Sequence, residues 1–430
     1  MMSLMFRQIT FITFVASLGG LLFGFDMAVV SGVLPVFKTQ YALDSFREGW
    51  FVSSALLGCI AGVVIASYLS DKCGRRRTLI VSALLFMVST LACILFTEFS
   101  HIIVGRILTG VGIGVASNVV PLYLSEISPV KDRGKLVTFY QLALTLGIVL
   151  AYVSNAYIVK SASLFAEWNI GGLFSRFFVD ESWRGMFGVA LIPSVIFFIG
   201  LLFVPESPSW SGQLKGHSLR HYAELWKPVY RKSMLVGLFL PIFSQLCGIN
   251  VIIYYGPTIL GNLGFSLDHS LYGQIVIGVA NLLFTVIAIW KVDSLGRRPL
   301  YLAGTLGGAI CLFFAGILFY REALHSWWLM LSVVGFLACF AFSIGPLKFV
   351  VVSEIFPVGI RAKAMGVSIL AMWVSDALIG QITPFLLNNF GVYLTCFMLG
   401  LVCLSGFFFV LKNLPETKGK TIDEIQELLR

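Results

Sequence analysis

Apolar residues along this chain gather into twelve long runs that are separated by short polar connections. The runs span residues 9–34, 49–69, 78–98, 101–124, 136–158, 183–204, 234–259, 270–290, 299–320, 327–352, 364–388 and 391–411. A helix needs about 20 mostly apolar residues to cross the hydrocarbon core of a bilayer. Each run therefore predicts one membrane-spanning helix, and the whole pattern predicts an all-α membrane protein with twelve transmembrane helices.

The composition excludes a soluble protein. Apolar residues make up 58% of the 430 residues and charged residues only 12%, whereas a soluble domain carries roughly 25% charged residues. Twelve spans also leave room only for short connections, so we expect no large soluble domain.

The net charge of +9 reflects membrane topology and not a nucleic-acid partner. When the connections are assigned alternately to the two sides, 22 of the 30 Lys and Arg residues fall on one side and six on the other. Loops that are rich in Lys and Arg face the cytoplasm, so we expect both termini there. The chain has no N-x-S/T sequon, which favours the inner (plasma) membrane of a bacterium.

Cysteine and histidine show no pattern of a cofactor, a metal site or an enzyme. The eight cysteines lie almost all within apolar runs and lack metal-type spacing, so we interpret them as small core hydrophobes. The five histidines lie in or beside loops, and no set of nucleophile and base is present. We therefore expect no cofactor and no enzymatic activity.

The polar connections repeat between the two halves of the chain. Three segments of the first half, at 70–77, 125–135 and 205–208, return in the same order in the second half, at 293–298, 353–363 and 415–419. Secondary transporters are built from such repeats, with the substrate site near mid-membrane between them.

The repeat divides the chain into two pseudo-symmetric halves with six helices each. We expect an N-terminal half at 1–204, a cytoplasmic linker with short helices at 205–232, a C-terminal half at 233–411 and a cytoplasmic tail at 412–430.

The motifs in these segments resemble those of the sugar porter family of the major facilitator superfamily over nearly the whole chain. They read GGLLFGFD (19–26), DKCGRRR (71–77), GRILTGVGIG (105–114), PLYLSEISP (121–129), PESP (205–208), GINVIIYYGP (248–257), DSLGRR (293–298), SEIFP (353–357) and PETKG (415–419). The resemblance implies the major facilitator fold and solute transport by alternating access, and it requires no oligomer.

Two charged residues, Asp26 and Arg106, stand inside apolar runs. Such charges are costly in a membrane and are usually functional. At 1.5 Å per residue their depths agree within about 5 Å, so the two side chains can pair. One interpretation is an ion pair that only fixes helix packing. The other is a carboxylate that takes up and releases a proton, and the resemblance favours it because proton-coupled members have aspartate at the position of Asp26.

Charged residues recur at equivalent places in the cytoplasmic connections of both halves. They are Asp71, Arg75, Glu126, Arg133, Glu206, Asp293, Arg297, Glu354, Arg361 and Glu416. The preference of basic residues for the cytoplasmic side explains the arginines, but it does not explain why carboxylates recur at equivalent positions in both halves. The resemblance implies salt bridges between helices that act as a latch for the outward-facing state.

A substrate site for a sugar should combine polar groups with aromatic walls inside apolar helices. The candidates that match substrate positions of the family are Phe23, Gln141, Ser244, Gln245, Asn250, Tyr255, Phe349, Met372 and Trp373. The alternative is that the amides only hold helices together through hydrogen bonds.

Several of these positions depart from the family pattern. Ser244, Phe349 and Met372 replace residues that usually contact hexose, so we expect D-glucose to be a poor substrate and a pentose, a polyol or a modified sugar to be favoured.

Lys348 and Asp376 are unexpected charges. Because Lys348 stands about five residues from the inner end of its run, we expect its side chain to snorkel to the cytoplasm; the estimated depths disfavour a direct pair with Asp376.

Together these features predict proton-coupled symport of a small polyhydroxylated solute, with sugar and proton as the partners of the protein in the bilayer. Facilitated diffusion by the same fold is the first alternative. A solute sensor that does not transport is the second, but such sensors usually carry long cytoplasmic tails, and nineteen residues follow Leu411 here.

Overall fold

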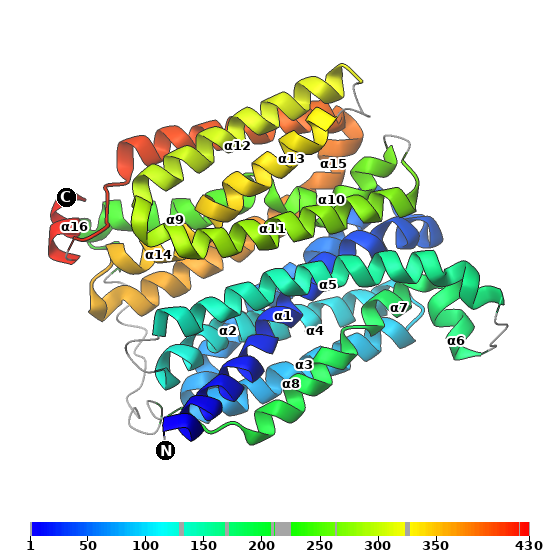
Figure 1. Ribbon diagram of the computed structural model, residues 1–430, viewed down its shortest axis with the longest axis horizontal. Helices are drawn as coiled ribbons and strands as arrows, with labels where there is room; N and C mark the ends of the chain where they lie inside the picture. The colour runs from blue at the N-terminus through cyan, green and yellow to red at the C-terminus, as the bar shows by residue number, and fades with distance from the viewer. Residues whose placement is uncertain are drawn as a thin grey trace. The chain divides into compact units, whose positions relative to one another are not determined.

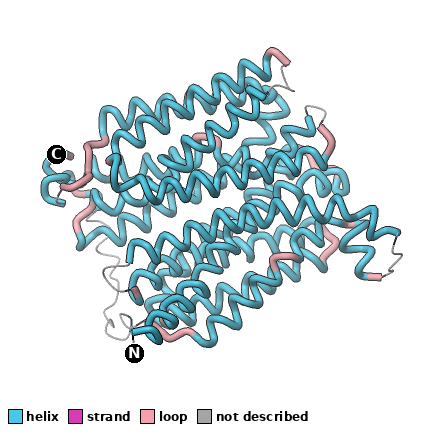
Figure 2. The backbone as a smooth tube through the Cα atoms, in the orientation of Figure 1, coloured by secondary structure: helices cyan, strands magenta, loops and turns pink. Residues whose placement is uncertain are grey.

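The computed structural model describes residues 2–128, 133–167, 172–207, 210, 225–262, 265–322, 327–420 and 422–429. Within these residues every regular element is a helix (Figures 1 and 2). The α-helices are α1 (Met2–Tyr41), α2 (Ser45–Cys73), α3 (Arg75–Leu95), α4 (Phe99–Ile127), α5 (Arg133–Glu167), α6 (Leu173–Ser175), α7 (Ser182–Gly188), α8 (Leu191–Phe203), α9 (Arg231–Leu246), α10 (Ile249–Asn262), α11 (Leu267–Leu295), α12 (Arg297–Tyr320), α13 (Trp327–Cys339), α14 (Gly345–Ile355), α15 (Val358–Asn413) and α16 (Ile422–Leu428).

The described residues contain eleven helical segments that are long and apolar enough to cross a membrane. The last of them, Lys363–Asn413, is 51 residues long and holds two spans. Gly391 divides it, because its φ of +73° interrupts the helical backbone of α15, and glycine adopts a positive φ without steric cost. The twelve predicted spans are thereby confirmed.

Three spans are built from consecutive shorter helices. The sixth consists of α7 and α8, and the seventh consists of α9 and α10. Gly248, with a φ of +105°, separates α9 from α10. In the tenth span, a π-helical turn at Phe340–Ile344 joins α13 to α14. Irregular backbone at membrane depth is tolerated only where it is buried in protein or lines a polar cavity, so Gly248 and the π-helical turn mark places where a site can form.

The chain forms two compact units. The first contains Met1–Lys215 and Ile253–Val279, and the second contains Gly216–Ile252 and Ala280–Arg430. Within the first unit, the hydroxyl of Tyr152 donates to the carbonyl oxygen of Ile253 at 3.3 Å, which ties the start of that segment to α5. Most of the predicted linker lies outside the described residues, so its boundaries and those of the tail stay predictions.

Glycines bring the helices of the first unit into close contact. Gly58 and Gly62 on α2 face Gly110 and Gly114 on α4, and a Cβ atom at any of the four would overlap a backbone carbonyl oxygen of the other helix. Small residues four positions apart allow membrane helices to approach this closely. On α1, Gly24 lies in the same way against the backbone of α5. These contacts fix the positions of α1 and α4, the two helices that carry Asp26 and Arg106.

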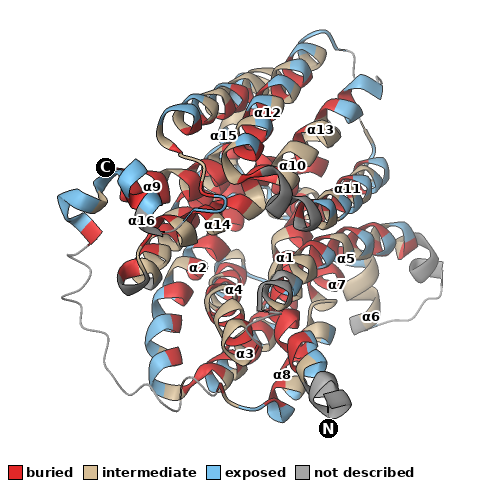
Figure 3. Cartoon of the chain, turned by 60° about the vertical axis from the view of Figure 1, so that its left-hand side comes forward, coloured by how far each residue is buried: buried red, intermediate tan, exposed pale blue. Residues whose placement is uncertain are grey.

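Burial follows the pattern expected of membrane helices. In each unit the buried residues lie mostly where helices face one another (Figure 3). Large apolar side chains such as Val64, Ile192 and Ile310 remain exposed, and lipid would cover them.

Candidate functional site

Asp26 on α1 and Arg106 on α4 form a buried ion pair. One terminal nitrogen of the arginine, Nη1, lies 2.7 Å from Oδ1 and 2.8 Å from Oδ2 of the carboxylate. The exposed fractions are 7% for Asp26 and 2% for Arg106. The guanidinium also lies over the rings of Phe51 and Phe187, with its central carbon 5.8 and 5.5 Å from the ring centroids. The two charges of the sequence analysis therefore stand next to each other in an aromatic, water-poor environment.

A second charged cluster lies in the first unit at the ends of α2, α3 and α4. Arg75, at the start of α3, donates from Nε and Nη2 to the two carboxylate oxygens of Glu126 at 3.1 and 2.9 Å. It also lies 3.4 Å from Oδ1 of Asp71. The hydroxyl of Ser207 donates to the same Glu126 carboxylate. The bidentate geometry makes this a strong, oriented contact.

The same cluster caps the N-terminus of α3. Oε1 of Glu206 accepts hydrogen bonds from the backbone N–H groups of Arg75 at 2.7 Å and Arg76 at 3.1 Å. A carboxylate at this end of a helix satisfies unpaired N–H groups and interacts favourably with the helix dipole. Gly74 must be glycine for two reasons: its φ is +94°, and a Cβ atom there would meet the Glu206 carboxylate.

The second unit contains the repeat-related copy of this cluster. Nη2 of Arg297, at the start of α12, lies 3.0 Å from Oε1 of Glu354 on α14. The hydroxyl of Thr417 donates to Oε2 of Glu354 at 2.5 Å. Thr417 therefore takes the place that Ser207 has in the first unit. Each cluster lies entirely within one unit, and each joins three polar connections that the sequence analysis had recognised as repeats.

Glu416 caps α12 as Glu206 caps α3. Its two carboxylate oxygens accept from the backbone N–H groups of Arg297 at 2.9 Å and Arg298 at 3.0 Å. Burial opposes ionisation of Glu416, but hydrogen bonds from the backbone N–H groups of Lys418, Arg297 and Arg298 outweigh it and hold the pKa of this carboxyl below its ordinary value. Gly296, with a φ of +88°, repeats the role of Gly74.

The remaining predicted latch residues have different surroundings. Arg361 donates from Nε to the carbonyl oxygen of Phe356 at 3.2 Å. The side chains of Arg133 and Asp293 lie outside the described residues. Ser207 and Thr417 were missed by the sequence analysis, although each directly follows the glutamate of a recognised repeat.

Part of the predicted substrate site is a buried polar network in the second unit. The Nδ2 group of Asn250 on α10 donates to Oε1 of Gln245 at 2.7 Å and to Oδ1 of Asp376 at 2.6 Å. The residue before Gln245, Ser244, accepts a hydrogen bond at 3.2 Å from Nζ of Lys348 on α14. The predicted snorkelling of Lys348 is therefore wrong. Its exposed fraction is 8%, because the helical face that carries it turns the side chain toward α9.

The other predicted substrate residues are distributed over both units. In the second unit, Phe349 lies beside Lys348, whose Nζ is 5.1 Å from the ring centroid, and Met372 and Trp373 are buried on α15. The remaining three belong to the first unit: Phe23 and Gln141 are half-buried and Tyr255 is fully buried. The substrate role of all nine candidates stays a prediction.

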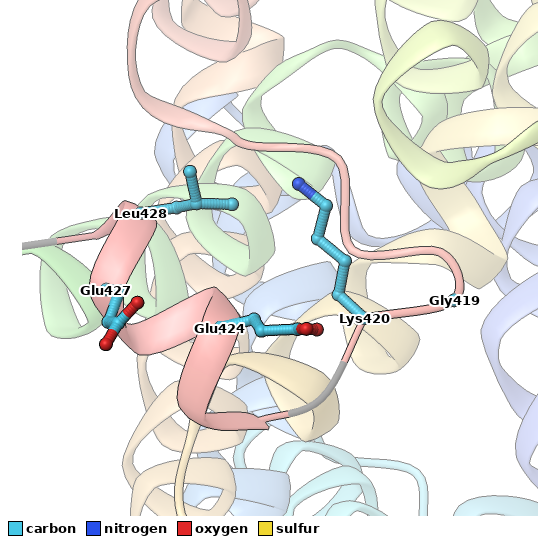
Figure 4. A pocket seen from close by; sticks show the side chains of 5 residues that line it. All are labelled: Gly419, Lys420, Glu424, Glu427 and Leu428. Carbon is cyan, nitrogen blue, oxygen red and sulfur yellow. The ribbon is translucent and has the colours of Figure 1, made fainter.

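One shallow hollow is also present beside α16. It is lined by Gly419, Lys420, Glu424, Glu427 and Leu428 (Figure 4). It contains none of the buried polar side chains described above, so we do not assign a solute site there.

A further polar cluster, which the sequence analysis did not identify, surrounds the half-buried Glu181 before α7. The carboxylate accepts from Nε of Arg184 and Nε of Arg176, each at 2.7 Å, and from Nε2 of Gln40 at 2.7 Å. Arg184 is fully buried and also donates to the carbonyl oxygens of Ile94 and Phe96. Burial opposes ionisation, but the hydrogen bonds outweigh it and lower the pKa of Glu181 to about 2.

We expect Glu181 to make the stability of the protein sensitive to acid. A lowered pKa in the folded state means that the ionised form stabilises the fold above the ordinary pKa, and this stabilisation is lost as the pH falls toward about 2. The thermal midpoint of the purified protein in detergent should therefore exceed that of Glu181→Gln at pH 7, and the difference should shrink below pH 4. A constant difference between pH 7 and pH 3 would contradict this assignment; Asp44→Asn, at the exposed start of α2, is the control.

Comparisons with known proteins agree with this architecture. The family model described as sugar (and other) transporter matches residues 12–218 and 211–429. The arabinose-proton symporter of Bacillus subtilis (strain 168) is 35% identical, over 96% of this chain and 93% of its own length. The D-xylose-proton symporter of Escherichia coli (strain K12) is also 35% identical, over 97% and 95%.

A solved structure gives the same result for the fold. The inward-open xylose transporter XylE from E. coli is 34% identical, covers 98% of this chain and 100% of its own, and superposes with a TM-score of 0.83. Family match, identity and fold agree over nearly all residues, and the chain belongs to the sugar porter family of the major facilitator superfamily.

Proposed function

We propose that this protein is a secondary active transporter that carries a small polyhydroxylated solute, a sugar or a polyol, together with protons by alternating access. The observation that carries the proposal is the buried ion pair of Asp26 and Arg106. Relatives named as proton symporters of arabinose and D-xylose support it. An ionisable pair inside a membrane span is costly and marks a functional site.

The geometry gives Asp26 a way to couple proton binding to helix movement. In the ionised state both oxygens of Asp26 hold Nη1 of Arg106, and this contact joins α1 to α4. Protonation removes the charge and with it the charge-assisted hydrogen bonds, which are about twice as strong as neutral ones. A proton on Asp26 thus loosens the junction between these helices, while the arginine favours release of the proton.

The direct test is transport by the purified protein in proteoliposomes. With an imposed pH gradient, a labelled solute from a panel of sugars, polyols and sugar acids should accumulate, and a protonophore should abolish the accumulation. Solute flow that is unaffected by collapse of the pH gradient would favour a facilitative uniporter instead. Failure of every solute in the panel to exchange would favour the sensor.

We place the protein in the plasma membrane of a bacterium, with both termini in the cytoplasm. The excess of Lys and Arg in the connections on one side supports this orientation. Both carboxylate–arginine clusters then lie on the cytoplasmic side.

The two clusters are proposed to stabilise the outward-facing state. Each holds the ends of its helices in a fixed arrangement through the pairs Arg75–Glu126 and Arg297–Glu354. The outward-facing state closes the cytoplasmic side, so it depends on the shape of these ends more than the inward-facing state does. The clusters would therefore bias the equilibrium between the outward-facing and inward-facing states without contacting the solute.

Glu354→Ala is expected to shift the population toward the inward-facing state. The substitution removes the partner of both Arg297 and Thr417, and each 1.4 kcal/mol that the outward-facing state loses changes the ratio about tenfold. The readout is the labelling of single cysteines placed on the two sides of the membrane. Glu126→Ala should act in the same direction, whereas Glu427→Ala on the exposed side of α16 should change nothing. Equal labelling in Glu354→Ala and the unmodified protein would refute the latch.

A further inference from the structure

The second unit contains two opposite charges inside membrane spans, Lys348 on α14 and Asp376 on α15. Both residues are buried, with exposed fractions of 8% for Lys348 and 2% for Asp376. The negative charge of Asp376 acts on the ammonium of Lys348. A buried ion is unfavourable unless an opposite charge compensates it. The two charges therefore stabilise each other, and the pair as a whole is neutral.

The two charged side chains are bonded to opposite sides of the break in the seventh span. Nζ of Lys348 donates to the hydroxyl of Ser244 at 3.2 Å, on α9 before the break at Gly248. Oδ1 of Asp376 accepts from Nδ2 of Asn250 at 2.6 Å, on α10 after the break. The charge pair therefore holds both ends of the short segment that carries three of the predicted substrate residues.

Asp376 also decides which way the amide of Asn250 is turned. An ionised carboxylate only accepts hydrogen bonds, so the Nδ2 group of Asn250 must point toward it. The same Nδ2 group donates its other hydrogen to Oε1 of Gln245 at 2.7 Å. This orientation leaves the carbonyl oxygen of Asn250 as an acceptor and the Nε2 group of Gln245 as a donor. Such a combination suits a hydroxyl group, which both donates and accepts.

We infer that Lys348 and Asp376 are specificity-determining residues of the solute site, whose opposite charges make it accept an uncharged polyhydroxylated solute and reject an acid or an amine of the same shape. This inference rests on the proposed transport function and names the residues that set its substrate class. An added anion is attracted by Lys348 and repelled by Asp376, and an added cation experiences the reverse. Nothing then offsets the loss of water around the added charge.

The inference predicts opposite effects when one charge of the pair is removed. Asp376→Asn leaves the ammonium of Lys348 and should make the site favour an acid. Lys348→Met leaves the carboxylate of Asp376 and should make the site favour an amine. A residue that only packs helices together would change the binding of all three solutes in the same direction. The direction of the change therefore distinguishes a specificity role from a structural one.

The test uses binding of matched probes to the purified full-length protein, so that it does not depend on proton coupling. D-gluconate, D-glucitol and D-glucamine share one carbon chain and differ in an end group that is negative, neutral or positive. D-galacturonate, D-galactose and 6-amino-6-deoxy-D-galactose form a second set. In at least one set the neutral member should bind about tenfold or more tightly than both charged members. Charged members that bind as tightly as the neutral ones, or no binding by either neutral member, would overturn the inference.

Variants of the pair show which residue excludes which charge. Asp376→Asn should raise the affinity of the acid relative to the neutral member about tenfold or more, and Lys348→Met should do the same for the amine. Lys348→Arg keeps the charge and should leave both ratios unchanged. If the ratios stay the same in both single variants, the pair has only a structural role and the inference is wrong.

Thermal stability gives a second readout, which applies even where a single variant binds no solute. The double variant, Lys348→Met with Asp376→Asn, contains no unbalanced charge, so its thermal midpoint in detergent should exceed that of each single variant. A double variant that is less stable than both single variants would show that the two charges do not compensate each other, and it would overturn the inference.

The inference and the proposed function can fail separately. Proton-driven accumulation of a neutral solute by the unmodified protein, together with unchanged binding ratios in the single variants, would refute the inference and leave the proposed function intact. Changed binding ratios without any proton-driven accumulation would support the inference and refute the coupling.

Discussion

Replacing Asp26 by asparagine should abolish accumulation of solute against its gradient and leave exchange of solute across the membrane intact. Asparagine has nearly the same size and still offers an oxygen to Arg106, but it cannot take up a proton. With one proton per solute, a pH gradient of one unit supports about tenfold accumulation, since tenfold corresponds to 1.4 kcal/mol. The ratio should fall to one in Asp26→Asn. Counterflow should persist, because it requires no net movement of protons.

The controls separate coupling from folding. Asp44→Asn makes the same chemical change in an exposed carboxylate at the start of α2 and should still accumulate solute. Asp26→Glu keeps an ionisable group and should retain part of the coupling. If Asp26→Asn left the buried Arg106 charge unbalanced and unfolded the protein, counterflow would be lost as well. Normal proton-driven accumulation in Asp26→Asn would end the proposal that this residue carries the proton.

Gly110→Ala should prevent formation of a stable first unit, although it adds only one methyl group. The added Cβ atom would overlap the carbonyl oxygen of Ala55, and the Cα of Gly58 lies 2.9 Å away. Backbone atoms cannot rotate out of the way as a side chain can, so α2 and α4 would have to separate. Their separation would open the neighbouring glycine contacts and move Arg106, which lies one turn earlier on α4.

A matched control exists on α15. A Cβ atom at Gly366 would meet nothing within 4 Å, and alanine favours the helix over glycine by about 1 kcal/mol. Gly366→Ala should therefore be as stable as the unmodified protein or more so. Size-exclusion profiles and thermal midpoints of both variants in detergent give the comparison. A Gly110→Ala protein that is monodisperse and melts normally would mean that the helices are not held this closely.

The spans could be predicted from the sequence because the bilayer imposes one requirement on every helix, namely a long apolar run. The run pattern separated residues 364–388 from 391–411, and the structure places the break at Gly391. The helix ends could not be predicted in this way. The helices α1 and α2 continue beyond their apolar runs, to Tyr41 and Cys73. The length of an apolar run indicates how much of a helix lies in the bilayer, and it does not show where the helix ends.

The position of a residue in its apolar run predicts only how deep it lies in the membrane. The estimated depths of Asp26 and Arg106 predicted that these residues could pair, and the ion pair is present. The estimated depth of Lys348 gave a wrong prediction for its side chain, because the direction of a side chain depends on the rotation of the helix about its axis. Packing against α9 sets this rotation for α14, and the pattern of hydrophobic residues does not predict it. The same holds for Ser207 and Thr417, whose partners come from segments 81 and 63 residues away.

The carboxylate that caps α12 resists protonation. Backbone N–H groups hold the ionised form of Glu416 and lower its pKa. Under the orientation proposed above, Glu416 lies on the cytoplasmic side, and it should keep its charge when that compartment becomes moderately acidic. Acidification of the cytoplasm by proton-coupled uptake would therefore leave the start of α12 capped.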